Sequence, residues 1–147
     1  FFFLNIFGII IFLNSCGYSP IYSSTNLNLK INQIEYKKNI LNNQIARSLR
    51  LFSNPKSLKN YDIEFDTKTE RRIVSKNSKG TPEVYEIKII LNLDIFGDNK
   101  DYSRKFTDIL KYRNNENKFE LKQYEKEIEK QITNELIEQI LVYFSDL

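Results

Sequence analysis

Hydrophobic and polar residues alternate in four segments of the chain, and each alternation predicts a β-strand with one buried face. The first begins at Leu27 and continues to Tyr36, with a slip of one residue at Ile34 that indicates a bulge or the strand end. In the third segment, Val84–Phe96, Glu86 and Lys88 belong to the polar face. The other strands are expected at Tyr61 to about Val74, Val84–Phe96 and Tyr102–Tyr112.

Two further segments repeat hydrophobic residues at helical spacing. The shorter helix is expected to start at Asn39 or Asn42, either of which is a suitable N-cap, and to stop before Asn54-Pro55. Its stripe is Leu41, Ile45, Leu49 and Phe52. The longer helix covers about Phe119–Phe144, with the stripe Leu121, Tyr124, Ile128, Ile132, Leu136, Ile140 and Phe144. Its solvent face is expected to consist of Glu125, Lys126, Glu127, Glu129 and Lys130, a mixture of charges unlike a membrane-lying helix.

The segments between these elements have the composition of turns and loops. Lys76–Pro82 and Gly97–Lys100 predict hairpin turns, and Arg113–Lys118 predicts a polar loop. The order is therefore β-α-β-β-β-α, with a right-handed crossover between the first two strands. We expect an α+β two-layer sandwich in which two helices pack on one face of a four-stranded mixed sheet.

A charge-free apolar run precedes these elements. Residues 1–13 are too short for a typical membrane span but fit the hydrophobic region of a signal peptide. Leu13-Asn14-Ser15-Cys16 resembles a bacterial lipobox. We therefore expect residues 1–15 to be a signal peptide, 16–26 a lipidated tether and 27–147 one α+β domain. An uncleaved inner-membrane anchor is the alternative for the apolar run.

Cys16 is the expected lipidation site, because it is the only cysteine, it occupies the cysteine position of the lipobox and it comes directly after the hydrophobic region. The resemblance implies acyl chains, palmitate among them, on its thiol and amine. Several chains anchor a protein firmly, whereas a single chain is marginal. Gly17 after the cysteine favours export to the outer membrane. An ordinary cysteine behind a cleaved leader is the alternative.

Composition excludes several functional classes. A net charge of +3 without a basic stripe argues against a nucleic-acid partner. With no histidine and one cysteine, the chain lacks a Ser–His–Asp triad, a Cys–His pair and a histidine- and cysteine-ligated zinc site. These catalytic and zinc-binding arrangements are therefore excluded. Enzymes built on Asp, Glu, Lys or Tyr alone remain compatible with this composition.

The residues Cys16-Gly17-Tyr18-Ser19-Pro20-Ile21-Tyr22 resemble the start of mature LptE, the lipopolysaccharide-assembly lipoprotein. The β-α-β-β-β-α order is also similar. The resemblance implies a non-enzymatic protein that plugs a large outer-membrane β-barrel, LptD, supports assembly of that barrel and helps deliver lipopolysaccharide to the outer leaflet. It implies no metal site, no cofactor beyond the acyl lipid on Cys16, and a location on the periplasmic side of the outer membrane.

The resemblance also implies where ligands bind. Basic residues at the second hairpin and the start of the last helix are linked to lipopolysaccharide in the family, and Lys76, Lys79 and Lys122 occupy those positions here. Lys68, Arg71 and Arg72 add charge near the same hairpin, where a solvated charged surface is the simpler interpretation. Tyr18, Pro20 and Tyr22 are candidates for contact with the barrel or the membrane.

Two other functions compete with this interpretation. An accessory or pilotin-like lipoprotein of another envelope machine would share the anchor and the fold. A tethered enzyme could use Asp62, Glu64 and Asp66, which alternate along one strand face, for acid–base chemistry or a metal. A solvent-facing row of carboxylates is the simpler interpretation of that alternation.

Overall fold

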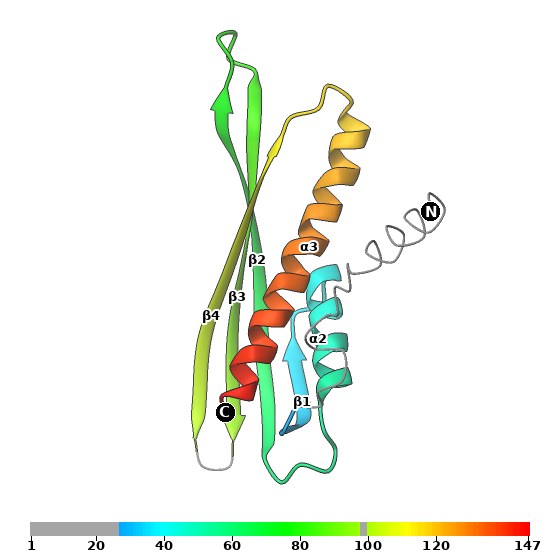
Figure 1. Cartoon of the computed structure of the whole chain (residues 1–147), viewed down its shortest axis with the longest axis vertical. Helices are drawn as coiled ribbons and strands as arrows, with labels where there is room; N and C mark the ends of the chain where they lie inside the picture. Colours follow the sequence, from blue (N-terminus) through cyan, green and yellow to red (C-terminus); the bar gives the residue numbers. More distant parts are fainter. Residues whose placement is uncertain (1–26, 98–99) are drawn as a thin grey trace, which may run out of the picture.

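The fold of the chain is a four-stranded mixed sheet with two helices on one face, as the sequence predicts (Figure 1). The structure, a computed structural model, describes residues 27–97 and 100–147. The elements run in the order β1 (Lys30–Tyr36), α2 (Ile40–Phe52), β2 (Asn60–Lys76), β3 (Pro82–Gly97), β4 (Asp101–Arg113) and α3 (Lys118–Ser145).

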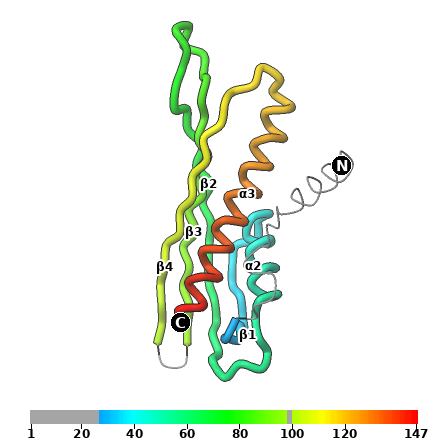
Figure 2. The backbone as a smooth tube through the Cα atoms, viewed as in Figure 1, coloured from blue at the N-terminus to red at the C-terminus, as the bar shows by residue number. Residues whose placement is uncertain are grey.

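The strands lie in the order β1-β2-β3-β4. The β1 strand is parallel to β2, because α2 connects them, while β2, β3 and β4 form an antiparallel meander. The register of β1 shifts between Ile31 and Gln33, which confirms the expected bulge. The β2 and β3 strands extend well beyond β1 and α2, and their hairpin projects from one end of the molecule (Figures 1 and 2).

Helix α2 begins at the first of the two expected caps. The side chain of Asn39 accepts a hydrogen bond from the backbone N of Asn42 at 2.7 Å. Asn42 itself is fully buried beside β2. Its Nδ2 donates to the Lys37 carbonyl at 2.8 Å and to Asp66 Oδ1 at 3.3 Å, and its Oδ1 accepts from Thr67 Oγ1 at 2.7 Å. The amide therefore joins the start of α2 to the middle of β2.

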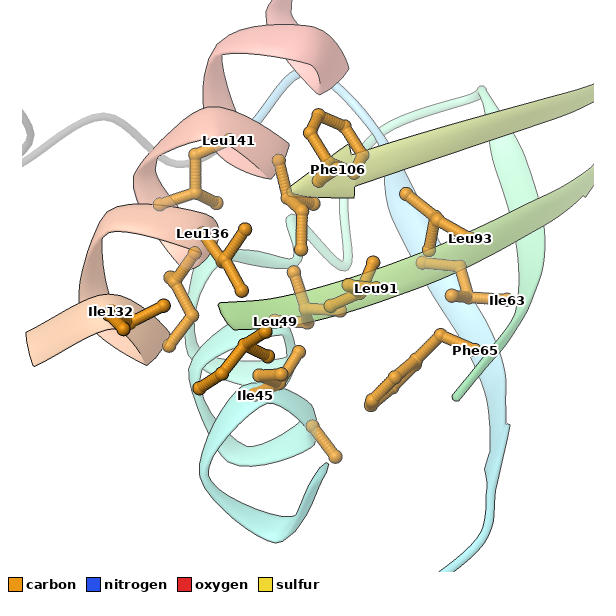
Figure 3. Packing of buried hydrophobic residues seen from close by; sticks show 14 of the residues in the cluster. Ile45, Leu49, Ile63, Phe65, Leu91, Leu93, Phe106, Ile132, Leu136 and Leu141 are labelled. Carbon is orange, nitrogen blue, oxygen red and sulfur yellow. The ribbon is translucent and has the colours of Figure 1, made fainter. Parts of the chain in front are cut away.

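The hydrophobic core lies between the sheet and both helices. Figure 3 shows Ile45 and Leu49 of α2 and Leu136 of α3 on one side of the core, with Phe65 and Leu91 of the sheet on the other. Apolar side chains from β2, β3 and β4 face the helices at alternate positions, as the strand patterns predict. Neither helix of the described residues is both long and apolar enough to cross a bilayer.

The stripe predicted for α3 is correct except at Tyr124, which is 48% exposed. At this level of the helix the sheet-facing position belongs to Glu125, whose side chain is only 19% exposed. Glu125 was expected on the solvent face, so that prediction is also wrong. The carboxylate turns inward because Arg71 and Tyr112 of the sheet bind it. Tyr124 is thereby left on the flank of the helix.

Glu129, one turn further along, is partly buried rather than fully on the solvent face. Burial raises the pKa of its carboxyl, and the neighbouring Glu125 raises it further. The expected polar face of α3 is therefore narrower than its sequence indicates. It lies on the side away from both the sheet and α2.

Candidate functional site

The tip of the β2–β3 hairpin is an exposed turn organised by one asparagine. Asn77 Oδ1 accepts hydrogen bonds from the backbone N of Lys79 at 3.0 Å and of Thr81 at 2.9 Å. Gly80 has a φ of +80°, a left-handed conformation that favours glycine. Lys76 and Lys79 are both exposed on this turn.

The start of β3, directly after this turn, is hydrogen-bonded to the loop that leads into α3. Asn114 donates from its backbone N to the Glu83 carbonyl at 2.7 Å and from its Nδ2 to the Pro82 carbonyl at 2.8 Å. Lys118 Nζ donates to Asn114 Oδ1 and to the Asn115 carbonyl, both at 3.1 Å. This brings the start of α3 to the same end of the molecule as the hairpin (Figure 1).

Lys122 is exposed near the beginning of α3. The β2–β3 hairpin and the start of α3, which carry the three predicted lipopolysaccharide-contacting lysines, lie at one end of the molecule (Figure 1). They do not line a common pocket, however. A groove of about 1050 Å³ lies between the end of β4 and the start of α3, and its cations are Lys111 and Arg113. The sequence did not indicate a role for these two residues, because the alternation along β4 predicts only that they are exposed.

Beneath this groove, a polar cluster fastens α3 to the sheet. Arg71 NH2 lies 2.6 Å from Glu125 Oε1, and Arg71 Nε donates to the Tyr112 hydroxyl at 2.9 Å. The Tyr112 hydroxyl donates to Glu125 Oε1 at 2.6 Å. The Arg71 guanidinium also lies 4.2 Å from the ring centroid of Tyr85, which stacks on Tyr112. We call Arg71, Tyr85, Tyr112 and Glu125 the latch.

Burial and the hydrogen bond to Glu125 raise the pKa of Tyr112 to about 12. The phenol therefore stays protonated and donates its hydrogen bond at physiological pH. Arg71 and Tyr112 of the sheet both bind Glu125 of α3, so the latch holds α3 on the sheet. Tyr124 packs edge-on against the outer side of Tyr112 at 6.1 Å and lines the groove.

The cations of the basic segment of β2 lie on both faces of the sheet rather than together. Arg71 points toward α3, whereas Lys68 and Arg72 lie on the opposite face of the sheet, because successive strand residues alternate. Lys68 pairs with Glu70 at 2.7 Å, and this pairing lowers the pKa of that carboxyl. Arg72 pairs with Glu86 at 2.7 Å. Lys76 and Lys79 are therefore the cations of this segment that no carboxylate in the described residues binds.

The remaining candidates have these positions. Asp62, Glu64 and Asp66 lie exposed on one face of β2. No group of three or more acidic, histidine or cysteine side chains among residues 27–97 and 100–147 is arranged to hold a metal ion. The expected signal peptide, the lipidation site Cys16 and the candidate contacts Tyr18, Pro20 and Tyr22 lie outside the described residues, as do the central residues of the Gly97–Lys100 turn.

Solved structures of bacterial lipoproteins resemble this chain. Rare lipoprotein B of Shewanella oneidensis superposes with a TM-score of 0.55 at 14% identity, covering 76% of this chain and 96% of its own. The minor lipoprotein of Acinetobacter baumannii gives 0.56 at 15% identity, over 80% and 92%. Lipoprotein B of Nitrosomonas europaea gives 0.55 at 16% identity, over 80% and 85%.

The chain has the fold of these lipoproteins. The likeness covers at least 85% of each of these neighbours and at least 76% of this chain. Neither a family model nor a curated protein sequence matches the chain. At these identities the comparison shows the architecture, and functional residues do not carry over from it.

Proposed function

We propose that the protein is a non-enzymatic, lipid-anchored envelope protein of the LptE type. It sits as a plug inside an LptD-like outer-membrane β-barrel, supports assembly of that barrel and helps insert lipopolysaccharide into the outer leaflet. Its anchor is the acylated Cys16 on the periplasmic side of the outer membrane. It needs no cofactor for this role.

The proposal rests on the agreement between the fold and the N-terminal sequence, which point to the same class of protein. The fold of residues 27–147 is that of solved bacterial lipoproteins. The segment before it supplies a lipobox-like Leu13–Cys16 followed by the LptE-like sequence Gly17–Tyr22.

The charge distribution supports a binding role at the hairpin end. Lys76, Lys79 and Lys122 are exposed, and Lys111 and Arg113 line the adjacent groove. Lysine and arginine are suited to phosphate groups, which arginine can bind in a bidentate manner. We propose that Lys76, Lys79 and Lys122 contact the anionic headgroup of lipopolysaccharide, and that Tyr18, Pro20 and Tyr22 contact the barrel.

The test is gentle detergent extraction of the tagged full-length protein, expressed with its natural leader, followed by mass spectrometry of copurifying proteins. We expect a stoichiometric LptD-like β-barrel. A Cys16→Ala variant serves as the anchoring control and is expected to lose labelling by a palmitate analogue. Recovery of a different envelope complex would overturn the LptE-type function and favour an accessory or pilotin-like lipoprotein.

A further inference from the structure

The first turns of α3 pack on the sheet through fewer apolar contacts than the rest of the helix. We call residues 118–127 the arm. Within the arm, all of which the structure describes, Leu121 is the only buried hydrophobic side chain, whereas buried residues recur from Ile128 to the end of the helix. Helix α2 lies beside the later turns, where Gln44 Nε2 donates to Asn134 Oδ1 at 2.8 Å, and not beside the arm (Figure 1). A segment with few buried apolar contacts opens at a lower free energy than the core.

Besides Leu121, the latch holds the arm on the sheet. Glu125 of the arm binds Arg71 NH2 and the Tyr112 hydroxyl, each at 2.6 Å. The Arg71 side chain is 45% exposed, so solvent weakens its attraction to Glu125. At the start of the arm, the groove of about 1050 Å³ already separates α3 from the end of β4. The arm is therefore closed by one apolar contact and one partly exposed polar cluster.

Two features weaken α3 where the arm joins the rest of the helix. The buried Thr133 donates from its Oγ1 to the Glu129 carbonyl at 2.7 Å, a bond to the preceding turn that often bends helices. Glu125 and Glu129 lie one turn apart, and like charges at this spacing destabilise a helix. Burial and the neighbouring Glu125 both raise the pKa of the Glu129 carboxyl. The turn from Glu129 to Thr133 is therefore the place where α3 bends most easily.

The start of the arm is capped by residues that do not belong to the sheet. Asn117 Oδ1 accepts hydrogen bonds from the backbone N of Phe119 at 3.1 Å and of Glu120 at 3.3 Å. The Glu120 carboxylate accepts from Asn117 Nδ2 at 3.0 Å and from Asn115 Nδ2 at 2.9 Å. Such side-chain caps satisfy the free donors at a helix start. The arm can therefore leave the sheet without losing its cap, and so without unravelling from its end.

We propose that the arm is a hinged lid, which swings away from the sheet as a helical unit about the turn from Glu129 to Thr133 and is held closed by the latch. Opening separates Glu125 from Arg71 and Tyr112. It uncovers the Tyr112 ring, which is 4% exposed in the closed state, and widens the groove beside it.

Opening also changes the arrangement of the exposed lysines at this end of the molecule. Lys122 lies on the arm, whereas Lys76 and Lys79 lie on the β2–β3 hairpin. The latch therefore sets the distance between Lys122 and the two hairpin lysines. That these lysines share a lipopolysaccharide headgroup rests on the proposed function, whereas the opening itself does not.

Alkylation of a single buried thiol measures the opening. In the full-length protein, Cys16→Ala removes the only natural thiol, and either Leu121→Cys or Ile137→Cys supplies a new one. The two positions are matched in burial, at 5% and 7% exposed, but only the first lies in the arm. We expect iodoacetamide to modify the Leu121→Cys protein at least about tenfold faster, because the arm opens without global unfolding. Thermal melting identifies folded variants, and Leu141→Cys replaces an Ile137→Cys protein that fails to fold.

A second substitution tests whether the latch holds the arm. Arg71→Ala should raise the alkylation rate of the Leu121→Cys protein by about another tenfold, since Glu125 loses a charged hydrogen-bond donor. It should leave the rate of the Ile137→Cys protein nearly unchanged. Lys68→Ala is the matched control, because it removes the same charge from the opposite face of β2, where its carboxylate partner also lies on β2. The control should change the rate by less than about twofold.

Three results would overturn the hinged lid. Equal alkylation of the Leu121→Cys and Ile137→Cys proteins would mean that α3 leaves the sheet only as a whole. Exchange of the backbone amides of residues 122–127 as fast as the thiol opens would mean that the arm unravels instead of swinging. Equal effects of Arg71→Ala and Lys68→Ala would mean that the latch does not close it. These measurements involve neither a barrel nor lipopolysaccharide, so failure of the lid leaves the proposed function intact, and failure of the proposed function leaves the lid intact.

Discussion

At the scale of single residues, Asn42 shows how a buried polar group can hold two elements in register. Its amide lies in the core with three hydrogen bonds, to Lys37, Asp66 and Thr67. A buried polar group is tolerated when its bonds are made and costs free energy when they are lost. The side chain therefore fixes the start of α2 against one point on β2.

Replacing Asn42 by alanine should lower the free energy of unfolding by about 1–3 kcal/mol, because buried partners on Lys37 and Thr67 would remain without their hydrogen bonds. Urea denaturation monitored by circular dichroism measures this change. Asn43→Ala is the matched control on the exposed side of the same helix. Equal stability of the two variants would contradict the role assigned to the Asn42 amide.

The phenol of Tyr112 gives the latch a dependence on alkaline pH. Its pKa is raised to about 12 in the folded protein, whereas an unfolded tyrosine titrates near 10. The folded state therefore holds the proton more tightly, and this contribution to stability is complete below about pH 10. It falls as the pH rises from about 10 toward 12.

Between pH 8 and pH 11, ionisation of Tyr112 should lower the free energy of unfolding of the wild-type protein by about 1 kcal/mol. The Tyr112→Phe variant lacks this proton and should lose less stability over the same interval, although it is less stable at pH 8. Urea denaturation of both proteins at a series of pH values measures the difference. Lysine deprotonation affects both proteins equally, so parallel curves would show that Tyr112 does not titrate as described.

At the scale of elements, the packing of α3 follows from a stripe of apolar residues that is visible in the sequence. Leu136 is 0% exposed, between the sheet and α2. Leu136→Ala should destabilise the protein by about 2–5 kcal/mol, since the cavity adds to the lost burial. Leu51→Ala, at a position that is 74% exposed, should change stability by less than about 0.5 kcal/mol. Chemical denaturation of both variants tests the contrast.

The order of elements could be predicted because each apolar stripe repeats over several turns or strand residues. The phase slip near Ile34 indicated a bulge or the strand end, and the structure has the bulge. The errors fall on polar residues whose surroundings depend on other elements. Nothing in the sequence near Glu125 indicates that Arg71 and Tyr112 lie opposite it. The exposed position of Tyr124 follows from the same contact, and was missed for the same reason.

At the scale of the whole molecule, the two ends of an elongated sheet carry different sets of exposed charged residues. The hairpin end carries exposed lysines and the groove, and the opposite end carries the exposed carboxylates Asp62 and Glu64. The sequence identified Lys76, Lys79 and Lys122 only through resemblance to a family. It could not identify the groove cations Lys111 and Arg113, because the groove forms where β4 meets the loop into α3.

Lipopolysaccharide binding by the hairpin end can be tested on the purified protein at moderate salt. Replacing Lys76, Lys79 and Lys122 by alanine should weaken binding by about tenfold, since ion contacts near a surface each contribute up to about 1 kcal/mol. A matched control replaces Lys56, Lys126 and Lys130, which are also exposed. The control has the same net charge, so it accounts for non-specific attraction of an anionic lipid.

A second variant, Lys111→Ala with Arg113→Ala, separates the lysines from the groove. If the lysine triple variant binds as tightly as its control, those three residues are not the contact site. Loss of binding in the groove variant alone would move the site to the end of β4. Because these exposed side chains form no salt bridge within the described residues, both variants should retain the wild-type melting temperature. A loss of affinity then reports on contact with the headgroup rather than on the fold.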